Sequence, residues 1–245
     1  MQRYFANKKV DDSFILCDND IHHIKNVMRC KVDDLIEVVY DEYVYISKIT
    51  NLNPLKLQII DKCVCHSEMN FDLTIAIALV NEQKMDLILQ KLTELGVSKI
   101  IPVKTERSIV KLDKNKENKK IVRWRTICKE ASEQSKRTKI PEVTPIVTIE
   151  ELSKENKNMK LICSLNEKSK TISNYLTNDI EEILFTIGPE GGFTSNEEEI
   201  LLKNGFLPVS LGKRVMRVET AAIFVASIIN YIYEGWCYEL YYWIL

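Results

Sequence analysis

Two glycine-containing loops carry the residues of this sequence that are best suited to hold a ligand through backbone groups. The first is residues 188–192 (GPEGG), which follow an apolar run and precede a helical pattern. Glycine has no Cβ, so its peptide groups approach a ligand closely and φ can be positive. The sequence has neither the lysine of a phosphate loop nor the G-x-G-x-x-G spacing of a dinucleotide site. If the loop binds a ligand, its pattern predicts one that is held neither by a phosphate loop nor by a dinucleotide fingerprint. The alternative is that the loop is only a tight turn.

The second loop lies in residues 209–222 (VSLGKRVMRVETAA), where an apolar run ends at Gly212 and a basic stretch follows. Glu219 and Thr220 come next, and both residue types favour the start of a helix. Ligands of parallel α/β proteins bind beyond the carboxyl ends of the strands. Two loops that leave one sheet at that edge would form a single pocket.

The elements that must position these loops follow from hydrophobic periodicity. Residues 73–80 form an apolar run typical of a strand buried on both faces. Residues 84–95 show helical spacing of apolar side chains, and Gly96 provides a stop. We expect further strands at 98–103, 161–165 and 183–187, and helices at 121–134, 195–203 and from about 219 to 232. The alternation predicts an α/β class domain with a parallel sheet.

The first 70 residues have a different pattern. Short β-like runs lie at 14–16, 35–40, 43–46 and 55–60, and a helix is indicated at 20–28. This pattern predicts a small β-barrel. A polar stretch at 65–70 marks the boundary, so we predict one domain at 1–70 and a second at 71–245.

Composition narrows the class of protein. No apolar run approaches the ~20 residues of a membrane span, and the N-terminus does not resemble a signal peptide, so we expect a cytoplasmic protein without membrane contact. The seven cysteines contain no CxxC pair, and residues 63–66 (CVCH) fit a strand end better than a metal site, so no metal is predicted. The aromatic tail at 236–245 suits a partner surface or packing onto the last helix.

Charge is nearly balanced overall, at −1, but unevenly distributed. Residues 99–139 hold fourteen Lys or Arg against five Asp or Glu. A solvated helix face is the common cause of such a run, so RNA binding gains only modest support. The guanidinium groups of this region, which suit phosphate oxygens, belong to Arg107, Arg123, Arg125 and Arg137.

The two loops together resemble the SPOUT class of methyltransferases, and within it the family that methylates N3 of a uridine in 16S ribosomal RNA. Further motifs of that family occur in the same order along nearly the whole chain. They are residues 1–5 (MQRYF), 22–29 (HHIKNVMR), 90–97 (QKLTELGV), 106–112 (ERSIVKL) and 130–141 (EASEQSKRTKIP). Two positions depart from the family: Asp33 replaces the glycine of a turn, and the usual lysine is missing at Asn81 and Glu82, although Lys84 is near.

The resemblance implies a C-terminal α/β knot (a trefoil-knotted SPOUT domain) and a small N-terminal PUA-like β-barrel that binds RNA. It implies S-adenosyl-L-methionine as methyl donor, a site completed in a homodimer, and 16S rRNA or the assembled small ribosomal subunit as partner. The cofactor-binding residues it indicates are Leu165, Ile187, Gly188, Pro189, Glu190, Gly191, Gly192, Leu211, Gly212, Val215, Met216, Arg217 and Val218.

Methylation of uridine N3 requires loss of a weakly acidic imide proton. Arg217 would stabilise negative charge on the uracil oxygens, and Glu190 or Glu219 would accept the proton. A structural ion pair for Arg217 and a helix-cap role for Glu219 are the alternatives. The RNA-binding positions implied by the motifs are Arg3, Arg29, Lys91, Arg107, Gln134 and Arg137. Lys91 could instead pair with an acid on its own helix.

Two other functions remain open at this point. Another SPOUT specificity, for ribose 2′-O or for tRNA, would use a similar donor pocket with different RNA contacts. A catalytically silent RNA-binding protein would not need intact glycines in both loops.

Overall fold

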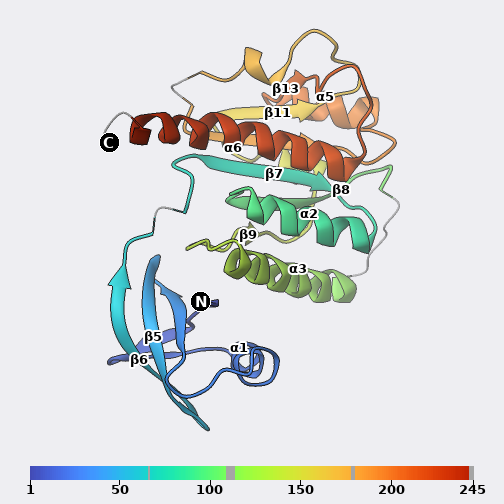
Figure 1. Ribbon diagram of the computed structural model, residues 1–245. Helices are drawn as coiled ribbons and strands as arrows, with labels where there is room; N and C mark the ends of the chain where they lie inside the picture. The colour runs from blue at the N-terminus through green and yellow to red at the C-terminus, as the bar shows by residue number, and fades with distance from the viewer. Residues whose placement is uncertain (66, 109–113, 178–179, 243–245) are drawn as a thin grey trace. The chain divides into compact units, whose positions relative to one another are not determined.

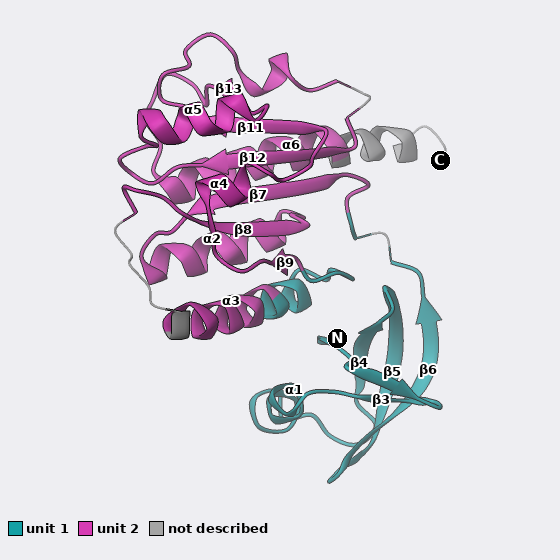
Figure 2. Ribbon diagram, turned by 180° about the vertical axis from the view of Figure 1, so that it is seen from behind, with its two compact units in different colours: residues 1–68, 129–140 teal, residues 69–128, 141–245 magenta. Residues whose placement is uncertain are grey.

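The computed structural model describes residues 1–65, 67–108, 114–177 and 180–242. His66, the end of the motif at 106–112 and the last three residues of the aromatic tail lie outside the described residues. The chain divides into two compact units, coloured separately in Figure 2: Met1–Glu68 with Lys129–Ile140, and Met69–Cys128 with Pro141–Leu245. The division therefore falls near residue 68 and again within one helix, because residues 129–140 make most of their contacts with the N-terminal unit.

The N-terminal unit is built on a four-stranded sheet of order β1-β4-β5-β6 and a separate β2–β3 hairpin. Its strands are β1 (Arg3–Phe5), β2 (Lys8–Val10), β3 (Ser13–Ile15), β4 (Leu35–Tyr40), β5 (Tyr43–Leu52) and β6 (Leu55–Cys63). Helix α1 (Asp18–His22) continues as a π-helical turn over His23–Val27. The four runs expected to be strands are strands, whereas β1 and β2 were not foreseen.

Alternating burial gives this sheet its core. Ile36 and Val38 point inward from β4, and they pack with Tyr4, Ile24 and Ile49. The β4–β5 turn places Asp41 and Glu42 at positive φ, as a tight hairpin requires. Asp33, at the position where the family usually has glycine, adopts φ 77°. Aspartate can occupy this position because it tolerates the left-handed region better than most residues.

The second unit contains a seven-stranded parallel sheet of order β10-β8-β7-β12-β11-β13, with β9 also paired to β8 (Figure 1). Its strands are β7 (Asp72–Ala78), β8 (Lys99–Lys104), β9 (Glu142–Val143), β10 (Val147–Thr148), β11 (Met159–Cys163), β12 (Glu182–Ile187) and β13 (Leu207–Val209). The parallel α/β sheet expected from the sequence is confirmed. The short edge strands β9 and β10 were missed because two residues carry no periodicity.

Helices cover both faces of this sheet. They are α2 (Glu82–Glu94), α3 (Lys114–Gln134), α4 (Ile149–Leu152), α5 (Ser195–Lys203) and α6 (Val218–Tyr242). Apolar side chains of α2, α3 and α6 pack on one face with Leu73, Ile75 and Ile77 of β7. Helices α4 and α5 pack on the other face, against Ala76. Strand β7 is therefore buried on both sides, which explains its unbroken apolar run.

One detail of this unit bears on the site. Asn81, where the family lysine is missing, caps α2: its side chain accepts a hydrogen bond from the Lys84 N–H at 2.9 Å. Asparagine is among the preferred residues at a helix N-cap. In the part of the chain that the structure describes, no helix has the length and apolar character needed to cross a membrane.

Candidate active site

The GPEGG loop leaves the carboxyl end of β12 and enters α5. Gly192 has φ 68°, and its N–H donates to the Pro189 carbonyl at 2.8 Å, which closes a tight turn. Helix α5 then starts with a capping box between Thr194 and Glu197. The Glu197 carboxylate also accepts a hydrogen bond from the Glu106 N–H at 2.7 Å, so the loop after β8 is tied to the start of α5.

The second glycine loop leaves β13 at the same edge of the sheet and enters α6. Gly212 has φ 112°, and a Cβ placed on it would have no atom within 4 Å. Its backbone therefore needs glycine, while the space beside its Cα is open. The wall of an open cavity has this property, and a side chain there would project into the space that a ligand would fill.

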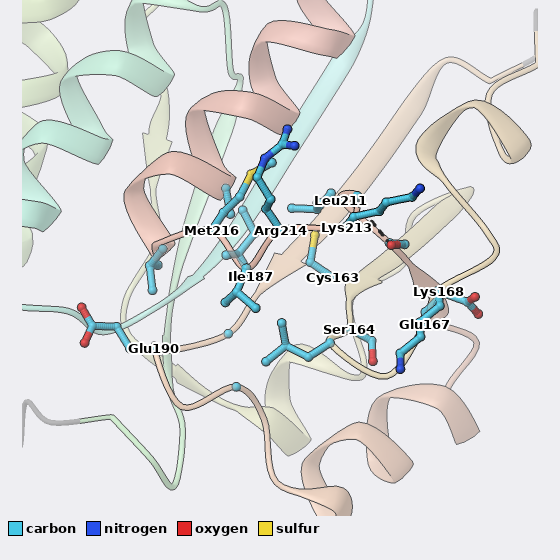
Figure 3. A pocket seen from close by; sticks show the side chains of 18 of the residues that line it. Cys163, Ser164, Glu167, Lys168, Ile187, Glu190, Leu211, Lys213, Arg214 and Met216 are labelled. Atoms are coloured by element: carbon cyan, nitrogen blue, oxygen red, sulfur yellow. Dashed lines mark hydrogen bonds between the residues drawn. The ribbon is translucent and has the colours of Figure 1, made fainter.

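A cavity of about 790 Å³ lies between these loops and the loop after β11 (Figure 3). This volume is in the range of small-molecule sites. Every cofactor residue expected from the resemblance lines the cavity except Gly191 and Arg217. Ser210, Lys213, Arg214 and Ala221 of the predicted loop 209–222 also line it, although the resemblance did not single them out. The lining residues outside both predicted loops that the sequence did not indicate are Cys163, Ser164, Glu167, Lys168 and Thr171.

The loop after β11 is the wall that sequence reasoning largely missed, although its position after a parallel strand was a usable signal. Glu198 of α5 holds it: one carboxylate oxygen accepts from the Ser164 hydroxyl at 2.6 Å and the other from the Asn166 amide at 2.9 Å. Leu165, between them, covers Gly192, and a Cβ on Gly192 would lie 3.3 Å from its side chain.

Glu167 stabilises the rest of this loop. Its carboxylate accepts hydrogen bonds from the Ser169 hydroxyl and from the N–H groups of Ser169 and Lys170, which lower its pKa to about 2. A parallel bridge between Thr171 and Ser210 then joins the loop to the end of β13. The three loops at this edge of the sheet are therefore mutually connected.

Arg107 supports the GPEGG loop from outside the cavity. Its guanidinium donates to the Gly191 carbonyl at 2.6 Å and to the Phe193 carbonyl at 3.2 Å. A Cβ on Gly191 would lie 3.3 Å from the Arg107 Cδ. Gly191 therefore faces an arginine side chain, whereas Gly212 faces the open cavity.

Three charged residues meet at the rim. Lys84 of α2 contacts the carboxylate of Glu190, and its Nζ lies 3.6 Å from Oε2 of Glu219 at the start of α6. The hydrogen bond from Lys84 is the main cause that lowers the pKa of Glu190, and the same bond raises the pKa of Lys84. Glu219 Oε2 is buried and has no hydrogen-bond donor among the described residues. Arg217 is exposed and close enough to affect both Lys84 and Glu190.

Two of the arginines expected to bind RNA are buried in the N-terminal unit. The Arg3 side chain is 5% exposed; it donates to Glu37 at 2.8 Å and also contacts the Lys136 carbonyl. Arg137 pairs with Glu68 through two nitrogens, at 3.1 and 2.7 Å. Both guanidinium groups therefore bond to the protein itself.

Lys91 and two arginines of the basic region also have partners within the protein. Lys91 pairs with Glu94, three residues away on α2, as the alternative interpretation proposed. Arg123 forms a bidentate ion pair with Asp86, and Arg125 donates hydrogen bonds to the Val143 carbonyl. Of the expected RNA-binding residues, Arg29, Arg107 and Gln134 are exposed, but Arg107 bonds to the GPEGG loop. Arg29 has φ 53°.

Comparison with known proteins identifies the class. A family model described as an RNA methyltransferase domain matches residues 67–230, and one described as an RNA methyltransferase PUA domain matches residues 9–62. Fold and pocket together define a SPOUT-class methyltransferase, the α/β-knot class implied by the sequence resemblance, with an N-terminal PUA domain.

Individual relatives narrow the family. The chain is 34% identical to the ribosomal RNA small subunit methyltransferase E of Mesomycoplasma hyopneumoniae, with 93% of this chain and 98% of that protein covered. The Bacillus subtilis protein of the same name is 32% identical, with 94% and 96% covered. The chain therefore belongs to the family of ribosomal RNA small subunit methyltransferase E.

Solved structures agree with this assignment. One is the ribosomal RNA small subunit methyltransferase E of Neisseria gonorrhoeae bound to S-adenosylmethionine, with 31% identity, a TM-score of 0.87, and 95% of this chain and 98% of that chain covered. A methyltransferase of Legionella pneumophila, also bound to S-adenosylmethionine, shows 30% identity, a TM-score of 0.88, and coverage of 94% and 97%.

Proposed function

We propose that this protein transfers the methyl group of S-adenosyl-L-methionine to N3 of a uridine in 16S ribosomal RNA of the small subunit. The observation that carries the proposal is the cavity between the two glycine loops, which has the size of a ligand site and a backbone-lined wall. The relatives named above add the methyl donor and the kind of RNA.

The cavity fits the donor in shape and chemistry. Apolar side chains such as Leu165, Ile187 and Met216 suit its flat base, and the exposed backbone beside Gly212 suits polar groups of the ligand. When bound, the donor supplies a methyl group on a positively charged sulfur. The residues of this chain bind it, exclude water and align the acceptor, and they also act on the proton and the charge of the uracil.

Lys84, Glu190, Arg217 and Glu219 form the charged group that would act on the uracil. Lys84 keeps the carboxylate of Glu190 ionised, so that residue is present as a base although its basicity is reduced. Glu219 keeps an acceptor oxygen without a hydrogen-bond donor among the described residues. Arg217, being exposed, is free to neutralise charge on a uracil oxygen. Single-turnover rates against pH for Glu190→Gln and Glu219→Gln identify the proton acceptor.

The N-terminal unit is proposed to bind RNA, through the domain at 1–70 together with residues 129–140. Arg29 and Gln134 remain the proposed contacts there, because their side chains are exposed. Arg3 and Arg137 would act indirectly, by holding residues 129–140 in the unit, and Lys91 and Arg107 would act within the methyltransferase domain at 71–245. An rRNA substrate, free or in the small subunit, also supports our prediction of a cytoplasmic protein.

A homodimer is proposed through the methyltransferase domain. Helix α6 exposes Phe224 and Tyr231, which are 37% and 78% exposed, and Leu87 of α2 is 39% exposed. Helices α2 and α6 pack against each other, so these apolar side chains belong to one pair of helices. Exposed apolar groups of this kind are typical of interfaces. Light scattering at micromolar concentration should give twice the monomer mass. Tyr231→Glu should lower the measured mass toward that of the monomer.

Mapping of methylated nucleotides tests the proposed function. Unmodified 16S rRNA or small subunits are incubated with the protein and the donor, and the product is analysed by mass spectrometry. A single uridine with a base-linked methyl group is expected. A ribose methyl group, or methylation of tRNA in a parallel reaction that contains tRNA in place of rRNA, would establish another SPOUT specificity. Donor binding without any transfer would indicate a silent RNA-binding protein.

A further inference from the structure

Three cations at the mouth of the donor cavity have no acidic partner among the described residues. Lys168 belongs to the loop after β11, whereas Lys213 and Arg214 follow Gly212 in the loop before α6. All three side chains line the cavity and are exposed. By contrast, Lys84, Arg107 and Arg123 each bond to a carboxylate or carbonyl of the protein.

The acids that line the same cavity do not neutralise these cations. Glu190 is paired with Lys84. Glu167 accepts three hydrogen bonds from Ser169 and Lys170 of its own loop. Neither carboxylate forms an ion pair with Lys168, Lys213 or Arg214, so these three cations are available to an external anion.

We propose that Lys168, Lys213 and Arg214 bind phosphate groups of the RNA strand on either side of the nucleotide that is methylated. The proposal rests on the proposed function, and it gives the RNA a second contact surface on the methyltransferase domain. A base can reach the donor only after leaving its stack, which brings its flanking phosphates to the mouth of the pocket. Single-stranded nucleic acid is commonly held by basic grooves that follow its backbone.

The directions of the three side chains favour a strand over a single small anion. Figure 3 shows Lys168, Lys213 and Arg214 pointing away from one another around the mouth. One carboxylate, such as that of the donor, cannot contact three diverging cations. Successive phosphates of an RNA strand can.

The test compares Lys168→Gln, Lys213→Gln, Arg214→Gln and the triple variant with Lys203→Gln. Lys203 is an exposed lysine of α5 that pairs with Glu199 and lies outside the cavity lining, so it serves as the matched control. Affinity for unmodified 16S rRNA is measured from low to moderate salt, and affinity for S-adenosylmethionine is measured by calorimetry. Thermal unfolding verifies that each variant is folded, which is expected for exposed side chains.

Each single substitution should lower the slope of log affinity against log salt by about 0.7, and the triple variant by roughly two, through the loss of counterion release. RNA affinity of the triple variant should fall at least about tenfold at low salt, with donor affinity and the control unchanged. An unchanged slope in the triple variant would overturn the proposal. So would a loss of donor affinity parallel to the loss of RNA affinity, because the cations would then hold the donor.

Failure of the proposed function is distinguishable from these outcomes. Methyl transfer by the unaltered protein tests the function, whereas the salt slope of the variants tests the phosphate contacts. A normal product with an unchanged slope overturns only the inference about Lys168, Lys213 and Arg214. A changed slope with methylation at another RNA position supports the phosphate contacts and overturns the uridine-N3 assignment.

Discussion

The glycine loops and residues 129–140 both carry motifs of the same family, yet the structure uses their residues in different ways. The loop residues gather around one cavity. The basic residues of 129–140 instead pair with acids of the N-terminal unit: Lys129 with Asp20, Lys136 with Glu37, and Arg137 with Glu68. A glycine in a loop reports on the backbone at its own position. An arginine does not reveal whether its partner is a phosphate or a carboxylate from elsewhere in the chain.

The largest effect should come from breaking one of the buried pairs. Arg137→Ala leaves Glu68 without the guanidinium, and removal of one partner of a buried pair costs about 3 kcal/mol. We expect the amides of β4 and β5 to lose protection in hydrogen–deuterium exchange, while the donor pocket retains its affinity. Arg29→Ala is the matched control, since Arg29 is exposed. If Arg137→Ala lost RNA affinity with full protection of β4 and β5, Arg137 would contact RNA directly.

The second effect concerns the two glycines that the structure distinguishes. Gly212→Ala forces a side chain onto φ 112°, a strain of about 1–2 kcal/mol, and places its Cβ in the cavity. Calorimetry with S-adenosylmethionine should show at least about tenfold weaker binding. Gly191→Ala should change donor affinity much less, because its Cβ meets Arg107. Equal losses in both variants would contradict the placement of Gly191 outside the cavity.

A third test concerns the wall that the sequence did not indicate. Glu198→Ala removes both hydrogen bonds that hold Ser164 and Asn166, at about 1 kcal/mol each, so Leu165 should cover the pocket less firmly. Donor affinity should fall about fivefold to tenfold. Glu199→Ala, which removes only an exposed pair with Lys203, provides the comparison and should bind the donor normally. The same affinity in both variants would show that the wall does not depend on Glu198.

The last effect is a pH dependence of stability in the N-terminal unit. Burial raises the pKa of Glu133 to about 7, against the attraction of Lys129. A carboxyl group whose pKa is higher in the folded state than in the unfolded state binds more protons when folded, so its contribution to stability decreases as pH rises from about 4.5 to about 7. Glu133→Gln should flatten the pH dependence of urea unfolding over this range. An unaltered slope would show that Glu133 is ionised throughout.

Much of the molecule was determined by the sequence alone. The apolar run of β7, the helical spacing of α2 and the helix α5 at 195–203 are local properties, and each was predicted close to its observed bounds. The positions of the two glycine loops followed from the rule that parallel strands end at one edge. The cavity residues within 187–192 and 211–218, which exclude Gly191 and Arg217, were predictable for the same reason, since a loop that follows a strand must lie at that edge.

Only the tertiary structure decided which charged residues form ion pairs within the protein and which do not. Arg3 pairs with Glu37 on a neighbouring strand, and Arg137 pairs with Glu68, which is 69 residues away in the sequence. Lys84 of α2 pairs with both Glu190 and Glu219. Ion pairing depends on distances between segments that are remote in sequence, and no periodicity encodes those distances. For this reason the glycines in the sequence located the pocket. Only the fold showed that Lys168, Lys213 and Arg214, which have no acidic partner among the described residues, lie at its mouth.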